Sequence, residues 1–259
     1  MMTWLQRLFA RRGEKFKAIP DALWDDVLHV YPFLAALPFA EQRKLHNLSS
    51  RFLAHKEFTG VHGLEVTDAM AVAIAAQACL PVLNLGLRFY DDFKGIVVHP
   101  GAMLARRQVT DAAGVVHHYS EVLAGEAMEL GPVTLSWEDV ATSGGLAERG
   151  QNVVIHEFVH KLDMRDGHAN GCPPLASRAA KAAWQKTMQT SFDAFRESVV
   201  MHERFGAEAP WLDSYGAQSP VEFFAVASEA YFVNRTRFTQ EFPALAPLFD
   251  GFFKPATGR

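Results

Sequence analysis

The feature that most constrains this chain is the stretch VVIHEFVHKLD, residues 153–163. Its apolar residues recur at helical spacing, yet His156, Glu157 and His160 stand where a buried helix would carry aliphatic side chains. Positions i and i+4 of a helix point the same way, so both imidazoles can reach one ion, as in the HExxH zinc motif. The stretch therefore predicts a helix that carries a zinc site.

The residue types of this motif point to hydrolysis of an amide. Two imidazoles can hold Zn²⁺, which lowers the pKa of a bound water molecule to about 7. Glu157 lies beside such an ion without having to bind it, and it can pass a proton from the water to a leaving amine. We expect His156 and His160 as ligands, Glu157 as the catalytic base and one zinc ion per chain. The alternative is a structural helix whose histidines bond to carbonyl groups.

A catalytic zinc site needs a third protein ligand and an open position, and two candidates lie shortly after the motif. Asp166 stands six residues after His160, but Asp163 occupies the place of the glycine in the metzincin pattern HExxHxxGxxH. Without that glycine the turn is harder to make. His168 lies in the following loop, and no spacing rule favours it.

A distant glutamate is the third alternative for this ligand. Glu222 and Glu229 lie seven residues apart, so they share a face of an apolar helix. A carboxylate there is costly to bury without a partner, and a metal ion and a metal-bound histidine would supply one for each. Ser219 to Glu222 also form a capping box, in which the glutamate would only bond to backbone. These observations favour Glu222 as a ligand over a purely capping role.

Composition is that of an ordinary globular protein, with 49% hydrophobic and 21% charged residues. The net charge of -4 gives no basic surface for nucleic acid, so we expect no such partner. Basic residues cluster at 7–17, which fits a frayed amphipathic helix or a weak membrane-surface anchor. Cys79 and Cys172 fit no metal or redox spacing, which favours a reduced, cytoplasmic location in which both are bystanders.

Residues 69–87 form an uncharged run about as long as the shortest membrane-spanning helix. Gln77, Pro81 and Asn84 interrupt this run, and alanine dominates it. We therefore expect a buried helix that begins near Asp68 and ends before Pro81, followed by a strand, and no membrane span.

The pattern along the chain predicts an α+β fold: a mostly helical zincin-like domain with a small mixed sheet next to the HExxH helix. We expect one domain over 1–259, with a helical part at about 1–90 and the sheet and zinc site at about 91–259. Helices are expected from Pro20-Asp21, over Pro38 to Phe58, from Asp68, after Asn152, over Ser177 to Phe205 and from Ser219-Pro220. Strands of one sheet are expected at 95–99, 114–123 and 132–137.

Three stretches of the chain together resemble the Mlc titration factor A family of bacterial zinc peptidases. They are NVVIHEFVHKLDMRDG (152–167), SPVEFFAVASEAYF (219–232) and PVTLSWEDV (132–140). The resemblance implies a gluzincin-like site, related in layout to the zinc domain of anthrax lethal factor. On that layout, Glu222 matches the third zinc ligand. Tyr215, seven residues earlier, matches a tyrosine whose phenol donates to the oxyanion.

The resemblance also implies partners. Members of the family bind the glucose-responsive repressor Mlc and act as aminopeptidases on small substrates, so we expect a peptide substrate and a Mlc-like partner. The alternative is a non-catalytic module that titrates a transcription regulator. We expect VTLSW (133–137) as the edge strand that pairs with a peptide. Asp163 and Glu229 are expected to steady His156 or His160, although Asp163 can equally bond to backbone.

Overall fold

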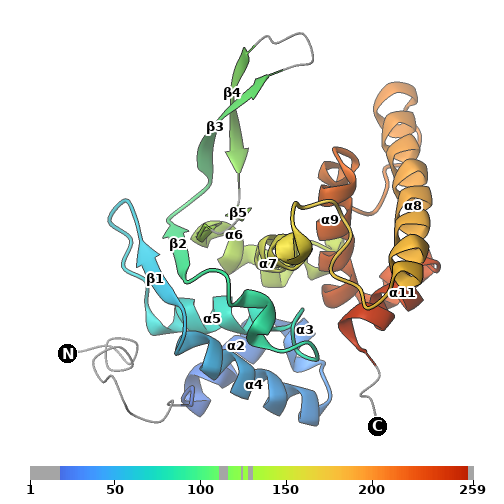
Figure 1. Cartoon of the computed structure of the whole chain (residues 1–259). Helices are drawn as coiled ribbons and strands as arrows, with labels where there is room; N and C mark the ends of the chain where they lie inside the picture. Colours follow the sequence, from blue (N-terminus) through green and yellow to red (C-terminus); the bar gives the residue numbers. More distant parts are fainter. Residues whose placement is uncertain (1–17, 111–115, 124, 128–130, 256–259) are drawn as a thin grey trace.

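The computed structural model describes residues 18–110, 116–123, 125–127 and 131–255 (Figure 1). The basic segment at 7–17 and the start of the strand expected at 114–123 lie outside this part. The α-helices are α2 (Asp21–Val30), α3 (Pro32–Ala35), α4 (Phe39–Leu53), α5 (Asp68–Cys79), α6 (Trp137–Thr142), α7 (Val153–Asp163), α8 (Arg178–Phe205), α9 (Pro220–Val233), α10 (Arg235–Glu241) and α11 (Leu245–Phe253). The 3-10 helices are η1 (Leu87–Tyr90), η2 (Ser143–Arg149), η3 (Met164–Asp166) and η4 (Ser214–Ala217).

The strands form one mixed sheet and one separate ribbon. They are β1 (Glu57–Gly60), β2 (Gly95–His99), β3 (Met103–Thr110), β4 (Val116–Leu123), β5 (Gly125–Ala127) and β6 (Val133–Ser136). The sheet has the order β1-β2-β6-β5, in which β1, β2 and β6 are parallel and β5 is antiparallel to β6. Strands β3 and β4 pair only with each other in the described part of the chain.

The predicted α+β fold with a small mixed sheet is confirmed, but two details of the sheet were wrong. The strand predicted at 114–123 belongs to the β3-β4 ribbon and not to the sheet. VTLSW (133–137) is not an edge strand, because β6 lies between β2 and β5. The edge beside it is the short strand β5, whose three residues carry too little pattern to be recognised from the sequence.

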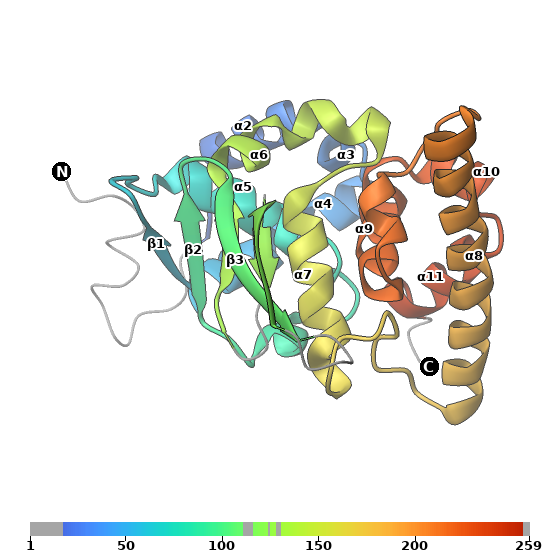
Figure 2. The ribbon, with the colours of Figure 1, turned by 90° about the horizontal axis from the view of Figure 1, so that it is seen from above.

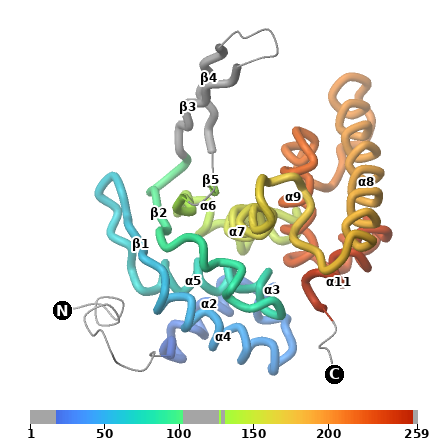
Figure 3. The backbone as a smooth tube through the Cα atoms, in the orientation of Figure 1, coloured from blue at the N-terminus to red at the C-terminus, as the bar shows by residue number. Residues whose placement is uncertain are grey.

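Helix α7 lies between the sheet and the helices of the C-terminal part. Figures 1 and 2 show α9 beside α7, with α8 beyond it, and Figure 1 shows α2, α4 and α5 below the sheet. The tube in Figure 3 shows the same order, from the sheet through α7 to α9 and α8. The buried hydrophobic side chains form one cluster that includes residues from Ile19 to Phe253. The single domain over 1–259 that the sequence predicts stays a prediction.

Two segments of the helical part differ from the prediction. The helix expected to reach Phe58 ends at Leu53, and β1 begins at Glu57. Two of the four residues of β1 are exposed, so the strand lacks the apolar run that identifies buried strands. The strand expected after Pro81 is also wrong, because a turn and then η1 follow there.

Helix α5 forms as the sequence predicts. Thr67 accepts the backbone N–H of Met70 and so caps the first turn, and the helix ends at Cys79, before Pro81. Residues 70–79 are all buried within the protein, which explains their apolar character without a bilayer. Among the described residues, no helix combines the length and hydropathy that crossing a membrane requires. Cys79 and Cys172 are buried and form no disulfide.

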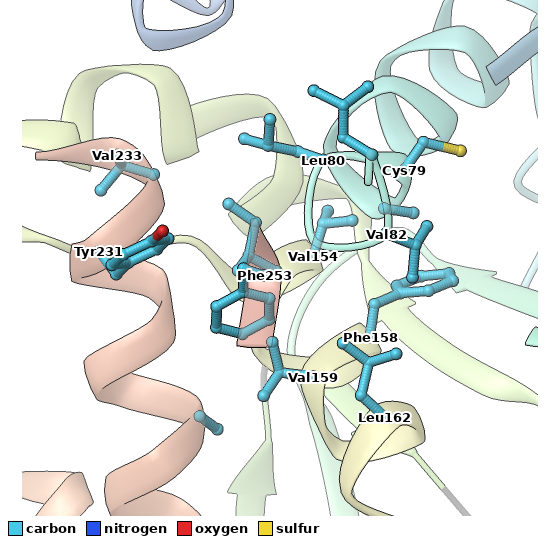
Figure 4. Close-up of a cluster of buried hydrophobic side chains, with 14 of the residues drawn as sticks. Cys79, Leu80, Val82, Val154, Phe158, Val159, Leu162, Tyr231, Val233 and Phe253 are labelled. Carbon is cyan, nitrogen blue, oxygen red and sulfur yellow. The ribbon is translucent and has the colours of Figure 1, made fainter. Parts of the chain in front are cut away.

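One face of α7 belongs to the core. Phe158 is fully buried and contacts the rings of Phe52, Tyr90 and Phe93, with ring centroids 5.7, 5.1 and 5.9 Å away. Figure 4 shows the α7 side chains Val154, Phe158, Val159 and Leu162 among apolar groups that include Leu80, Val82 and Phe253. Core packing therefore fixes the rotation of α7 about its axis.

We predict that Phe158→Ala lowers the free energy of unfolding by about 3–5 kcal/mol, because it leaves a cavity among these aromatic rings. The same substitution at Phe39, which is 75% exposed, should change the free energy by less than about 0.5 kcal/mol. Urea unfolding of both variants measures the difference. Equal losses would contradict the packing role of Phe158.

Candidate metal centre

Two helix starts set the geometry of the site. The side chain of Asn152 accepts the N–H of Ile155 at 2.9 Å and caps α7, as the sequence predicts. Ser219 accepts the N–H of Glu222 at 3.2 Å and caps α9, with Pro220 at its first position. The two helices pack against each other (Figure 2), which brings side chains about sixty residues apart in sequence to one place.

Three ligand-type atoms converge between these helices. His156 Nε2 lies 3.1 Å from His160 Nε2 and 3.1 Å from Glu222 Oε2, and His160 Nε2 lies 3.3 Å from the same oxygen. In the described part of the chain, these residues are the one group of three or more whose donor atoms could hold a metal ion. Their side chains keep 12%, 10% and 20% exposure, so the site opens to solvent.

The spacing of these atoms fits a zinc ion. Ligands about 2.05 Å from a tetrahedral ion lie about 3.3 Å apart, close to the three distances observed here. Each atom can present a lone pair to the other two, an arrangement that is unfavourable unless a proton or a cation lies among them. Two imidazoles and one carboxylate are a donor set that zinc accepts, and they leave a fourth position open.

Glu229 contacts His156 at the ring nitrogen that does not face Glu222. Its Oε1 lies 2.7 Å from His156 Nδ1, and its Oε2 accepts the backbone N–H of Asn152. Burial raises the pKa of Glu229, while His156 and the Asn152 N–H oppose that rise. A carboxylate can only accept, so Nδ1 carries a hydrogen and Nε2 is the nitrogen that can bind a metal ion. This is the contact that the sequence predicts for Glu229.

Glu222 takes part in both predicted interactions, with different groups. Its backbone N–H completes the cap with Ser219, while its carboxylate turns towards His156 and His160. Burial opposes ionisation of Glu222, but hydrogen bonds and charge interactions with the two imidazoles hold its pKa below the ordinary value. Burial lowers the pKa of His156, but Glu229 and Glu222 outweigh that effect and raise it overall. The surroundings thus favour an ionised Glu222 carboxylate beside a positively charged His156.

Glu157 is 5% exposed and lies on the turn of α7 that carries His156. Burial raises the pKa of its carboxyl, although both imidazoles act in the opposite direction. A carboxyl group with a raised pKa is better matched to accept and release a proton near neutral pH than an exposed one.

The remaining candidates lie elsewhere. Asp166 pairs with Lys181 at 3.1 Å, and neither it nor the exposed His168 belongs to the metal-capable group. Asp163 is fully buried, and both its oxygens accept backbone N–H groups of the loop at 170–172, at 2.7 to 2.9 Å. These hydrogen bonds of Asp163 are to backbone, as in the second of its two expected roles.

Tyr215 lies in η4, immediately before α9. Its N–H donates to the Asp213 carboxylate at 2.9 Å, and its ring centroid is 6.0 Å from that of His156. The side chain is half-buried. The structure therefore places the Tyr215 ring beside that of His156.

A buried amide network behind the site was missed. Gln77 of α5 accepts hydrogen bonds from Asn152 Nδ2 at 2.7 Å and from the Ser143 hydroxyl at 3.0 Å, and it donates to the Ala73 carbonyl at 3.0 Å. It joins α5 to the start of α7, which Glu229 also contacts. The signal was a single amide in an alanine-rich apolar helix, which needs hydrogen-bond partners when buried.

Comparison with known proteins identifies the family. Residues 5–254 match the family described as glucose-regulated metallo-peptidase M90. The chain belongs to this family. Mlc titration factor A from Yersinia pestis (strain Pestoides F) is 34% identical over 255 residues, which cover 98% of this chain and 90% of the relative. Mlc titration factor A from Yersinia pseudotuberculosis serotype O:1b (strain IP 31758) gives the same values.

A metal centre at His156, His160 and Glu222 can be tested with a variant of Glu229, because Glu229 contacts His156. We predict that Glu229→Gln weakens zinc binding about 10- to 100-fold. Glu229 uses one oxygen for the Asn152 N–H and the other for His156 Nδ1, and an amide has only one oxygen. Competition with a chromophoric chelator measures the affinity. Glu148→Gln, at an exposed position, should bind zinc as the wild type does. Equal zinc affinity of the two variants would show that Glu229 does not support metal binding.

Proposed function

We propose that this chain is a zinc-dependent peptidase with aminopeptidase-like activity on small substrates. His156, His160 and Glu222 would hold one zinc ion. The observation that carries the proposal is that the three donor atoms, from α7 and α9, lie 3.1 to 3.3 Å from one another, and that α7 also bears Glu157. Membership in the M90 family supports the same chemistry.

A bound zinc ion would supply an acidified water molecule and polarise the scissile carbonyl group. The protein contributes the groups that move and hold protons. Glu157 takes a proton from the attacking water and delivers it to the leaving nitrogen, a role that its burial suits. Glu229 keeps the hydrogen of His156 on Nδ1 and thus away from the site.

Two further elements would bind the substrate. Tyr215 lies beside His156, where its phenol can donate to the oxygen that becomes negative as the carbonyl is attacked. Strand β5 pairs with β6 on one side and is the last strand in the described order on the other. It also packs near α7, so its outer edge can pair with the backbone of a bound peptide.

We predict that Glu157→Gln retains the metal and lowers kcat for a chromogenic aminoacyl substrate by at least about 100-fold. The substitution preserves size and removes the proton acceptor. Steady-state kinetics on the zinc-loaded protein, with metal content measured in parallel, test this. Glu138→Gln, on the exposed start of α6, is the control. Undiminished turnover by Glu157→Gln would sink the proposed role of this carboxylate.

The names of the relatives favour a second function, binding of a Mlc-like transcriptional repressor. In this alternative the chain titrates the regulator and needs no catalysis. A cytoplasmic location, which the sequence predicts, would be required for it.

We predict that His156→Ala, which cannot complete the metal centre, still captures a purified Mlc-type repressor in a pull-down with unchanged affinity. The physical reason is that repressor binding needs an outer surface, whereas the His156 side chain is mostly buried between helices. Circular dichroism confirms that the variant is folded. Loss of capture by a folded variant would show that the partner requires the metal centre.

A further inference from the structure

The third candidate ligand stands on a different helix from the histidines, so something must fix the first turn of α9 against the end of α7. We propose that Asp163 and Gly171 do this as positioning residues: they hold a loop against Pro220 and thereby set the place of Glu222. We name residues 170–172 the clamp loop. The inference rests on the proposed zinc site and extends it to residues that touch no metal.

Asp163 anchors the clamp loop to α7. It is the last residue of the helix and lies three positions after His160. Its Oδ2 accepts the N–H groups of Asn170 and Gly171 at 2.9 and 2.7 Å, and its Oδ1 accepts that of Cys172 at 2.9 Å. Three consecutive backbone groups are thus tied to one fully buried carboxylate. Both oxygens serve the loop, so a neutral amide could not replace the carboxylate without loss.

Gly171 is held from a second direction by α8. Its carbonyl accepts the indole N–H of Trp184 at 2.8 Å. Trp184 is 1% exposed and is stacked on Phe249 and edge-on to Phe224, so its position is set by the core. The clamp loop therefore has anchors on two helices and little room to shift.

The opposite face of Gly171 meets the start of α9. Its φ of +74° lies in the left-handed region, which favours glycine. A Cβ at this position would lie 2.5 Å from the Pro220 carbonyl oxygen and 3.0 Å from its carbon. Ordinary contacts begin near 3.4 Å, so a methyl group requires a displacement of about 1 Å. Because the loop is anchored, this displacement falls on the first turn of α9.

Glu222 lies in that turn, two residues after Pro220. Metal–ligand distances tolerate only about 0.2 Å, so a shift of about 1 Å takes the carboxylate out of reach of an ion held by the histidines. The contacts run from Asp163, three residues after His160, through Gly171 to Pro220, two residues before Glu222. They explain why a loop outside the metal-capable group approaches α9 so closely.

The test compares Gly171→Ala with Gly206→Ala in the full-length protein. Gly206 has a similar φ of +69°, but a Cβ there meets nothing within 4 Å. It therefore reports the cost of the left-handed backbone without the collision. Zinc affinity is measured by chelator competition, and the visible spectrum of the cobalt-loaded protein reports the ligand set. Glu222→Ala provides the reference spectrum for a lost third ligand.

We predict that Gly171→Ala binds zinc at least about 10-fold more weakly and that its cobalt spectrum moves towards that of Glu222→Ala. Gly206→Ala should keep both properties and lower the melting temperature only by the cost of the left-handed backbone. A folded Gly171→Ala with wild-type affinity and spectrum overturns the inference. If this variant does not fold, Asp163→Asn takes its place with the same two outcomes.

The result also separates this inference from the proposed function. If the wild-type protein binds no zinc, the metallopeptidase proposal fails, and the inference fails with it. If the wild type binds zinc and Glu222→Ala loses affinity while Gly171→Ala does not, only the positioning role is wrong.

Discussion

The meeting of α7 and α9 is the constraint on which the site depends. Helix α7 supplies two imidazoles and α9 supplies two carboxylates. Glu222 contacts Nε2 of His156, and Glu229 contacts Nδ1 of the same ring. No single segment contains the site, so its geometry is a property of the packed molecule. Each helix start is capped by a polar side chain, which fixes the helix at the residue where the site begins.

The same helix serves the core and the chemistry. Phe158 packs among aromatic rings on one side of α7, while His156 and His160 face α9 on another. A substitution that loosens the apolar face would also change the direction of the imidazoles. Close packing therefore limits how far this helix can be altered without affecting metal binding.

The HExxH stretch and the helix from Ser219-Pro220 could be predicted because both combine a strong periodic pattern with cap residues. The sequence also indicated Glu222 and Glu229, since carboxylates on an apolar helix need partners. It could not indicate the edge strand, because β5 is three residues long and which strand pairs with β6 depends on tertiary contacts. For Asp163 the sequence left two roles open, and only the folded loop at 170–172 shows which backbone groups it binds.

The hydrogen bond between Gln77 and Asn152 has a consequence for how the two parts of the chain respond to each other. Local unfolding of α5 would withdraw the partner of the residue that caps α7 and also binds Glu229. Metal affinity and the resistance of α5 to hydrogen exchange are then reciprocally linked, so an ion bound among the histidines would protect amides in the helical first part of the chain.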